Sequence, residues 1–238
     1  MQIVRTTMDD RTWTGSRGRS GVWRLALENP GWDVDAEAVR LSPDERDGAD
    51  RAVPDVRRRR VLVRAGLRHV LGKLLGLSPE VVPVVRRDGR PVVVGSRRQC
   101  RYQVSCSASG GVALIGVAVG TPIGIDVEQV GDETVPTAVA EGWLSVRERA
   151  LIERLPRVEQ GPALTRAWVH KEAVVKAQGL GLRADLTRTV TPVAGHGWIG
   201  SWAVQPISVP AGHVAAVAIG RRAFGRAPSR PVLHEVIP

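Results

Sequence analysis

The hexapeptide LSPDER, Leu41 to Arg46, returns 103 positions further along the chain as LSVRER, Leu144 to Arg149. Each copy places a glutamate three residues after a serine, which is the spacing of a helix capping box. In the first copy Pro43 follows the serine, and proline suits the first turn of a helix. The hexapeptide therefore predicts that a helix begins at the same point in both parts of the chain.

A second match occurs at the same distance along the chain. Two stretches with apolar residues at helical spacing, 55–77 and 163–182, predict long helices. Gly76 marks the predicted end of the first helix, because glycine tolerates the left-handed turn that closes a helix. The same spacing at two places, with the same order of elements, indicates an internal duplication. The matching positions are Lys73, Gly76 and Leu77 in the first copy and Lys176, Gly179 and Leu180 in the second.

Short runs of apolar and β-branched residues around these helices predict strands. Asp88-Gly89 and the segment 109–111 are turn signals within two of these regions. We therefore predict an α+β fold of two similar subdomains related by pseudo-twofold symmetry, each with a small antiparallel sheet packed against a long helix. The predicted strand regions are 22–27, 81–94, 102–120, 123–130, 197–207 and 213–220.

The predicted division of the chain follows this repeat. An N-terminal subdomain would cover 21–119 and a C-terminal subdomain 120–222. A poorly ordered lead-in would cover 1–20, and a loosely ordered tail 223–238. Because ligand pockets often form between two such halves, we expect one functional site at their interface.

The composition is that of an ordinary globular protein. Of 238 residues, 43% are hydrophobic and 24% are charged, and no apolar run approaches the ~18 residues of a membrane span. The first residues lack the apolar core of a signal peptide, so we expect a cytoplasmic protein. Cys100 and Cys106 form no C-x-x-C pair, which argues against structural zinc and favours reduced thiols.

The net charge is +10, and arginine carries most of the positive charge. Such a chain suits an acidic partner, which could be a nucleic acid, a polyphosphate ligand or an acidic protein. A nucleic-acid-binding protein is therefore one hypothesis, although aromatic residues are only 4% and no zinc-finger, RNP or helix-turn-helix pattern occurs. The alternative is that most of these arginines are solvated surface residues.

Two carboxylates alternate with apolar residues in the stretch PIGIDVEQV, 122–130. Asp126 and Glu128 would share one face of a strand, and two like charges so close favour a cation between them. On the second long helix, Glu172 and Lys176 stand one turn apart. Three carboxylates from two elements suit Mg²⁺, which prefers hard oxygen ligands. The alternatives are a solvated strand edge and a surface ion pair.

Three blocks of the sequence resemble the signature motifs of one enzyme family. They are Gly124-Ile125-Asp126-Val127-Glu128, Leu144-Ser145-x-x-Glu148 and Trp168-x-x-Lys171-Glu172-Ala173-x-x-Lys176. The family is the 4′-phosphopantetheinyl transferases, in their long, pseudo-duplicated form that activates surfactin synthetase. The resemblance extends from about Val22 to Ile219.

The resemblance implies an enzyme that moves the 4′-phosphopantetheine arm of coenzyme A to a serine of an acyl or peptidyl carrier protein and releases 3′,5′-ADP. It implies Mg²⁺, with Mn²⁺ as an alternative, held by Asp126, Glu128 and Glu172. Glu172, directly or through a water, would take the proton of the serine hydroxyl. Lys176 would stabilise or protonate the leaving phosphate, and Glu148 would orient the helix or a lysine.

The resemblance also implies where coenzyme A binds. Ser105-Cys106-Ser107 stands where the family often has Ser-His-Ser, and Glu45 and Gly48 stand where some members carry lysines. An arginine would have to compensate for the missing histidine. The implied coenzyme A contacts are Arg60, Arg90, Ser105, Cys106, Asp126, Lys171 and Lys176.

Partners and rival functions follow in the same way. The implied partners are carrier-protein domains of polyketide or nonribosomal peptide biosynthesis, with no membrane and no nucleic acid, and the enzyme would be a monomer. Another Mg²⁺-dependent phosphotransferase is a rival hypothesis, but the sequence lacks the G-x-x-x-x-G-K-[ST] loop. A non-catalytic scaffold is a third hypothesis, which the intact carboxylates argue against.

Overall fold

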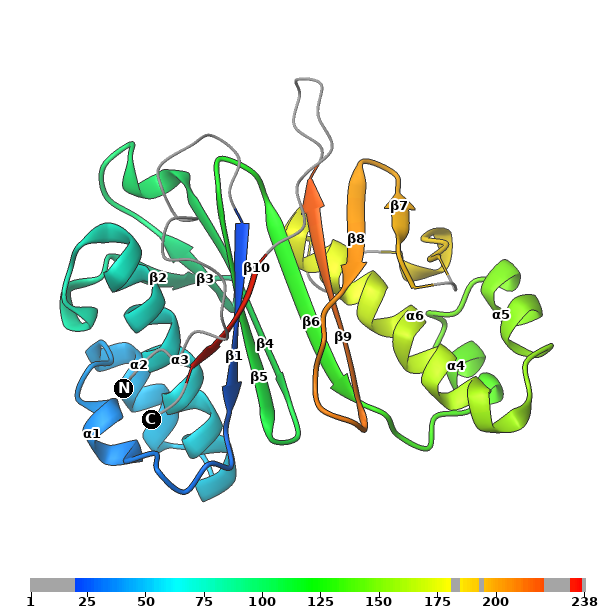
Figure 1. Ribbon diagram of the computed structural model, residues 1–238, viewed down its shortest axis with the longest axis horizontal. Coiled ribbons are helices and arrows are strands. Elements are labelled where there is room, and N and C mark those ends of the chain that lie inside the picture. Colours follow the sequence, from blue (N-terminus) through cyan, green and yellow to red (C-terminus); the bar gives the residue numbers. More distant parts are fainter. Residues whose placement is uncertain (1–19, 181–184, 193–194, 221–231, 237–238) are drawn as a thin grey trace. The chain divides into compact units, whose positions relative to one another are not determined.

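The computed structural model describes residues 20–180, 185–192, 195–220 and 232–236. The chain divides into two compact units: an N-terminal unit of residues 1–120 with 231–238, and a C-terminal unit of residues 121–230. Each unit combines a mainly antiparallel four-stranded sheet with helices, so the predicted α+β class is confirmed (Figure 1). Within the described ranges, no helix is both long enough and apolar enough to cross a membrane.

The N-terminal unit contains β1 (Ser20–Ala26), α1 (Val34–Ala38), α2 (Pro43–Asp50), α3 (Pro54–Leu75), β2 (Val84–Arg87), β3 (Arg90–Val93), β4 (Tyr102–Ser109), β5 (Val112–Val119) and β10 (Val232–Val236). Its main sheet has the strand order β10-β1-β5-β4, in which β5 runs antiparallel to both β1 and β4. β2 and β3 form a separate hairpin. Asp88 and Gly89 have φ angles of 49° and 77° in its turn, as predicted for a primed hairpin turn.

The core of the N-terminal unit lies between α3 and the main sheet. Leu67 and Leu71 of α3 pack with Leu25 of β1 and Ile115 of β5, and all four are buried. Gly66 permits this close approach, because a Cβ there would lie 2.7 Å from Leu25 Cδ2. The apolar positions that predicted a helix over 55–77 are therefore the residues that hold α3 on the sheet.

One expectation about the C-terminal segment was wrong. Residues 232–236, expected to belong to a loosely ordered tail, form β10, which pairs in parallel with β1 from Gly21↔Val232 to Leu25↔Val236. The pairing occupies an edge of β1 whose backbone groups would otherwise need water or another strand. The rest of the predicted tail and almost all of the predicted lead-in lie outside the described residues.

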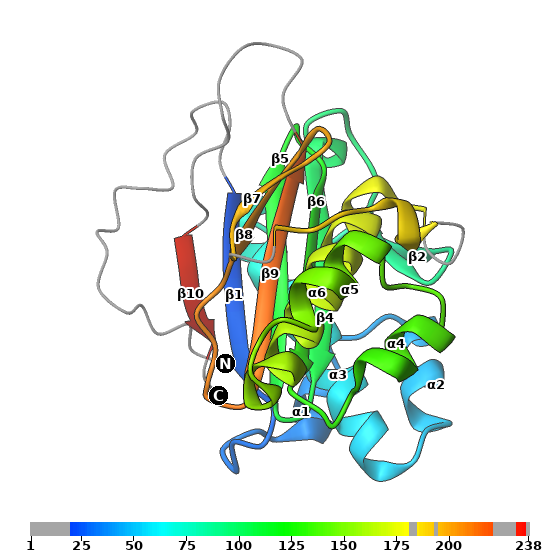
Figure 2. The ribbon, with the colours of Figure 1, turned by 90° about the vertical axis from the view of Figure 1, so that its right-hand side faces the viewer.

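The C-terminal unit contains β6 (Ile123–Gln129), α4 (Val135–Ala140), α5 (Val146–Ile152), α6 (Arg157–Gln178), β7 (Gly197–Ile199), β8 (Trp202–Pro206) and β9 (His213–Gly220). Its sheet is wholly antiparallel, with the strand order β6-β9-β8-β7. α6 packs along β6 and β9, as Figure 2 also shows. The helix begins six residues earlier than the predicted range 163–182 and runs through Pro162.

Both copies of the repeated hexapeptide begin helices. Ser42 and Glu45 form a complete capping box at α2, and Ser145 and Glu148 form one at α5, so the predicted helix starts are confirmed. The long helices that follow, α3 and α6, have 22 residues each. Each ends at a glycine in the left-handed conformation, Gly76 or Gly179.

Candidate active site

The tight crossing of β6 and α6 brings the predicted site residues together. A Cβ on Gly124 would lie 1.9 Å from the carbonyl oxygen of Ala173 and 2.4 Å from the backbone nitrogen of Ala177. Only a glycine therefore lets the strand touch the helix backbone at this point. The crossing places Asp126, two residues along β6, beside Lys176 on α6.

Asp126 and Lys176 form a short ion pair. The distance from Lys176 Nζ to Asp126 Oδ1 is 2.6 Å. Asp126 is only 1% exposed, whereas the lysine side chain is 27% exposed. The pair thus joins a buried carboxylate of the strand to an ammonium group that reaches solvent.

Glu172 stands one helical turn before Lys176 and is half-buried. Burial raises the pKa of its carboxyl group; the charge of Lys176 opposes this shift, while the charges of Asp126 and Glu128 add to it, and the net direction is upward. The three carboxylates predicted to form one site are thus close enough to influence one another. In the described part of the chain, however, no three acidic, histidine or cysteine side chains form a ready-made metal cage.

The donor set still suits a hard cation. Asp126 pairs with Lys176, and the charges of Asp126 and Glu128 both act on Glu172, so negative charge exceeds positive charge in a partly buried place. Oxygen ligands of this kind are those that Mg²⁺ takes in proteins. Asp126, Glu128 and Glu172 are therefore compatible with a divalent ion.

The expectation that Lys171 contacts coenzyme A is contradicted by its burial. Its side chain is 0% exposed, and Nζ lies 2.7 Å from each of three acceptors: Glu148 Oε2, the carbonyl oxygen of Trp143 and that of Leu186. An ammonium group has three hydrogens to donate, so none remains for a phosphate. Burial lowers the pKa of Lys171, which Glu148 opposes. Glu148, which was expected to orient the helix or a lysine, both caps α5 and pairs with Lys171.

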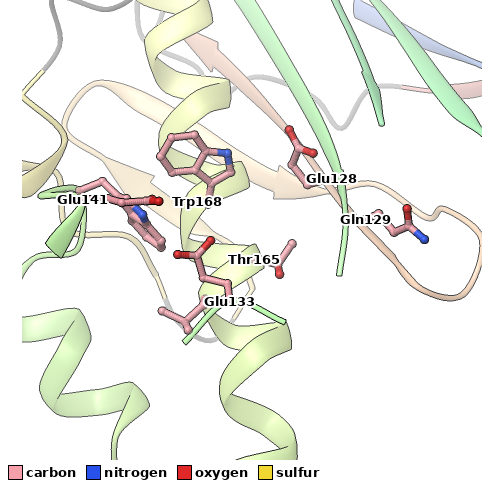
Figure 3. A pocket seen from close by; sticks show the side chains of 8 residues that line it. Glu128, Gln129, Glu133, Glu141, Thr165 and Trp168 are labelled. Atoms are coloured by element: carbon pink, nitrogen blue, oxygen red, sulfur yellow. The ribbon is translucent and has the colours of Figure 1, made fainter. Parts of the chain in front are cut away.

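A pocket of about 180 Å³ lies beside Glu128 (Figure 3). Trp143 and Trp168 form one aromatic wall, with ring centroids 5.2 Å apart in an edge-to-face arrangement. Burial raises the pKa of Glu133, and the charge of Glu141 adds to this effect. The lining residues are Glu128, Gln129, Glu133, Glu141, Trp143, Leu164, Thr165 and Trp168. Sequence reasoning missed those in the segment after β6, because they belong to no motif.

Comparisons with known proteins point to one enzyme family. Residues 122–207 match the family model described as the 4′-phosphopantetheinyl transferase superfamily. The chain is 30% identical over 204 residues to the 4′-phosphopantetheinyl transferase HetI of Nostoc sp. (strain PCC 7120), covering 83% of this chain and 86% of that protein. It belongs to the 4′-phosphopantetheinyl transferase family. It is also 28% identical over 131 residues to the 4′-phosphopantetheinyl transferase psf-1 of Bacillus pumilus, covering 55% of this chain and 54% of that protein.

In this transferase a second group of predicted residues lies in the N-terminal unit. Arg60 is exposed on α3 and donates a hydrogen bond to the carbonyl oxygen of Gly48 at 2.6 Å. Arg64, one turn later, donates to the carbonyl oxygen of Glu45. Burial lowers the pKa of Arg64; Arg86 and Arg60 lower it further, and Glu45 opposes them. Arg60, Arg64 and Arg86 thus form a basic cluster.

Sequence reasoning missed two members of the basic cluster. Arg64 could have been found, because it stands four residues after Arg60 and must share its face of the helix. Arg86 gave no such signal, since it comes from β2, and only the tertiary fold brings it near α3.

The remaining predicted contacts of the transferase lie on β3 and β4. Arg90 begins β3 and is half-buried, and Ser105 is buried on β4. Cys106 packs against the hydrophobic core of the N-terminal unit. Because neighbouring residues of a strand point to opposite faces, Cys106 turns away from the side that Ser105 occupies. The expectation that Cys106 contacts coenzyme A stays a prediction, and its packing shows that at least part of the side chain serves the core.

Proposed function

We propose that this transferase moves the 4′-phosphopantetheine arm of coenzyme A to a serine of an acyl or peptidyl carrier protein and releases 3′,5′-ADP. The observation that carries the proposal is the ion pair of Asp126 with Lys176 at the crossing of β6 and α6, close enough to Glu172 for their charges and that of Glu128 to act on it. The family to which the chain belongs, with its coenzyme A chemistry, supports the same reading.

Asp126, Glu128 and Glu172 would hold Mg²⁺ or Mn²⁺. When bound there, the ion would offset the charge that builds on the phosphates as the bond to the leaving group breaks. Asp126 holds Lys176 beside the proposed metal ligands through their 2.6 Å ion pair, and from there the lysine would bind the leaving phosphate. The two side chains would therefore act together on the pyrophosphate.

Glu172 suits the role of general base. Burial and the neighbouring carboxylates raise its pKa, and the charge of Lys176 opposes them. A bound cation would also oppose this shift, so the role of base rests on a carboxylate oxygen that the ion leaves free. The serine oxygen would form a bond to the β-phosphorus while the bond from that phosphorus to the leaving oxygen breaks. The hydroxyl proton would pass to Glu172 directly or through a water, and Lys176 would stabilise or protonate the released 3′,5′-ADP.

The basic cluster of Arg60, Arg64 and Arg86 would bind a phosphate group of coenzyme A. Guanidinium groups bind phosphate through paired hydrogen bonds, and three of them together leave an excess of positive charge in the N-terminal unit. Arg90 and Ser105 would add contacts to the nucleotide. This cluster would supply the charge that the absent family histidine does not.

We also propose that the two units arose by duplication and keep a pseudo-twofold relation. β1 and β6, α3 and α6, and the two capping boxes each stand 103 positions apart. A buried ion pair recurs at the same distance: Glu45 with Arg68, and Glu148 with Lys171. In this arrangement the N-terminal subdomain would contact the nucleotide and the C-terminal subdomain would perform the chemistry.

We also propose that the enzyme is cytoplasmic and that it acts as a monomer.

The decisive experiment incubates apo-carrier protein with coenzyme A, Mg²⁺ and the transferase, followed by mass spectrometry of the carrier. We expect the mass gain of one phosphopantetheine arm, lost when the ion is chelated. Asp126→Ala and Glu172→Ala should each lower the rate at least ~100-fold, because each removes several kcal/mol of charge stabilisation. Glu128→Ala should do less harm, because a water can take its place.

Two results would contradict the proposal. One is full activity of Asp126→Ala at limiting Mg²⁺. The other is no mass gain with any of a panel of carriers, together with salt-sensitive DNA binding that is tighter than carrier binding; this would favour the nucleic-acid hypothesis that the net charge of +10 suggests.

A further inference from the structure

Glu148 is the centre of a buried polar network in the C-terminal unit. Its Oε1 accepts hydrogen bonds from the backbone nitrogen and the hydroxyl group of Thr191, at 2.9 Å and 2.7 Å. Its Oε2 accepts from the backbone nitrogen and hydroxyl group of Ser145, at 3.0 Å and 2.6 Å, and from Lys171 Nζ at 2.7 Å. We call Glu148, Lys171 and Thr191 the Glu148 network. Five donors on one carboxylate fully satisfy it in the interior.

The Glu148 network ties two separate segments to α6. Lys171 donates to the carbonyl oxygens of Trp143, before α5, and Leu186, in the segment after α6. Thr191 brings in a further part of that segment. The bonds of Lys171 to Glu148, Trp143 and Leu186 converge on the residue of α6 directly before Glu172, and Thr191 acts on that residue through Glu148. The network therefore helps to set the rotation and the height of α6 at Glu172, together with the crossing of β6 at Gly124.

The network also supports the aromatic wall next to Glu172. Trp143, whose carbonyl oxygen receives a hydrogen bond from Lys171, packs edge-to-face against Trp168, one turn before Glu172. The Lys171 ammonium group lies 5.8 Å from the centroid of the Trp143 ring. A shift of Lys171 would thus disturb both the backbone and the neighbours of Glu172.

We propose that Lys171, Glu148 and Thr191 are positioning residues that hold Glu172 and Trp168 in their working places. The inference rests on the proposed function. It differs from the family-based expectation, in which Lys171 touches coenzyme A. Proton acceptance and metal binding both depend on the placement of Glu172 to within a fraction of an ångström, so a small displacement can cost a large factor in rate.

Stability alone is a weak reason for such a network. Replacing a buried ion pair by apolar residues of similar size is often neutral or stabilising. The N-terminal unit contains the matching pair, Glu45 with Arg68 at 2.8 Å, in which Arg68 also donates to the carbonyl oxygens of Pro79 and Val82. Arg68 lies far along the sequence from Glu172. Replacing it is therefore a matched control for the loss of stability that follows when a buried cation is removed.

The test compares Thr191→Val with Thr191→Ser. Valine keeps the shape but removes the hydroxyl donor to Glu148, whereas serine keeps the donor. We expect Thr191→Val to lower kcat about tenfold with the KM for coenzyme A within twofold, and Thr191→Ser to stay near the wild-type kcat. Lys171→Met should lower kcat further, again with little change in that KM. A residue that touched coenzyme A would instead raise the KM.

Arg68→Met is the structural control. It should lower the melting temperature about as much as Lys171→Met but keep kcat within about twofold. The double variant Glu148→Gln/Lys171→Met should recover stability without recovering kcat, since it removes the unpaired charge but not the misplacement. Hydrogen–deuterium exchange, which needs no activity, should show faster exchange in 141–149 and 185–192 of Lys171→Met than in the wild type.

Three results would overturn the inference. They are an unchanged kcat in Thr191→Val, a raised KM for coenzyme A in Lys171→Met at unchanged kcat, and recovery of kcat together with stability in the double variant. Each of these results counts only if the wild-type enzyme loads its carrier in the same assay. An inactive wild type would instead count against the proposed function, and the exchange experiment would still report on the network.

Discussion

Gly124 shows how one residue can decide whether the site exists. A side chain at this position would overlap the backbone of α6, at 1.9 Å from the carbonyl oxygen of Ala173. Gly124→Ala should therefore push the strand and the helix apart and cost at least ~2 kcal/mol of stability, with loss of carrier loading. Gly131→Ala is the control, because no atom lies within 4 Å of a Cβ there. Urea unfolding and the loading assay check both variants; equal stability of the two would contradict the close approach.

His170 is a second residue with a large expected effect. It is 1% exposed, and in the described structure neither ring nitrogen has a hydrogen-bond partner. Burial lowers its pKa from 6.5 to about 4; Arg166 lowers it as well, and Glu148 opposes them. The unfolded chain therefore takes up a proton at higher pH than the folded protein. The contribution of His170 to stability is full above pH 6.5 and declines as the pH falls from 6.5 toward 4.

The size of this effect can be measured. Between pH 7.5 and pH 5.0 the protonation of His170 should cost roughly 2 kcal/mol of unfolding free energy. His170→Leu should remove that part of the pH dependence, and the matching position of the N-terminal unit is already leucine, Leu67. His196→Gln, at an exposed position, is the control. Identical pH profiles for the wild type and His170→Leu in urea titrations would show that His170 is not the group responsible.

At the scale of elements, β10 covers the edge of β1 and becomes the edge strand of the sheet. The strand pairs in parallel with β1 through five residue pairs. Removing residues 231–238 would leave the backbone groups of that β1 edge unpaired, and exposed edges promote association. We expect a lower melting temperature and concentration-dependent oligomers, measured by calorimetry and light scattering. If the truncated protein stays monomeric and keeps the wild-type melting temperature, pairing with β10 is not needed for stability or to prevent association.

The long helices show which features of an element are local. The observed range of α3 differs from the predicted range by one or two residues at each end. The agreement is close because the apolar spacing and the glycine that ends the helix are local signals in the sequence. α6 starts earlier than predicted, at Arg157, because the first turns of the helix carry little apolar periodicity. Ala163 and Leu164 are buried in a hydrophobic cluster, and this packing stabilises the early part of the helix although its sequence pattern is weak.

At the scale of the whole molecule, the net charge of +10 should matter for the encounter with an acidic carrier protein. Arg147 and Arg149 are exposed on α5, although Arg149 also pairs with Glu153 at 2.8 Å. The double reversal Arg147→Glu/Arg149→Glu should raise the KM for the carrier several-fold and leave the KM for coenzyme A unchanged. Raising the ionic strength should reduce the difference, because exposed charges are screened beyond ~10 Å at 0.1 M salt.

A reversal elsewhere separates a local docking effect from the total charge. Arg97→Glu/Arg98→Glu changes the net charge by the same amount at two exposed positions of the N-terminal unit. If both double variants raise the KM for the carrier equally, only the overall charge matters. Carrier kinetics that do not change from low to high salt would refute steering altogether, whatever the outcome at Asp126 and Glu172.

The sequence by itself determined the features that depend on neighbours in the chain. These include the capping boxes at Ser42 and Ser145, the Asp88-Gly89 turn, the strand with Asp126 and the helix face with Glu172. The physical reason is that caps, turns and side-chain direction are set by local backbone geometry. Spacing along the chain is enough to read them.

Only the tertiary structure decided which charged groups are buried and what they contact. Lys171 looked like a phosphate ligand, but segments that start at Trp143 and Leu186 close over it and use all its donors. Arg86 joins Arg64 from a distant strand, and β10 returns to β1 across most of the chain. Burial and long-range pairing depend on which distant segments pack together, and no periodicity within one segment records that choice.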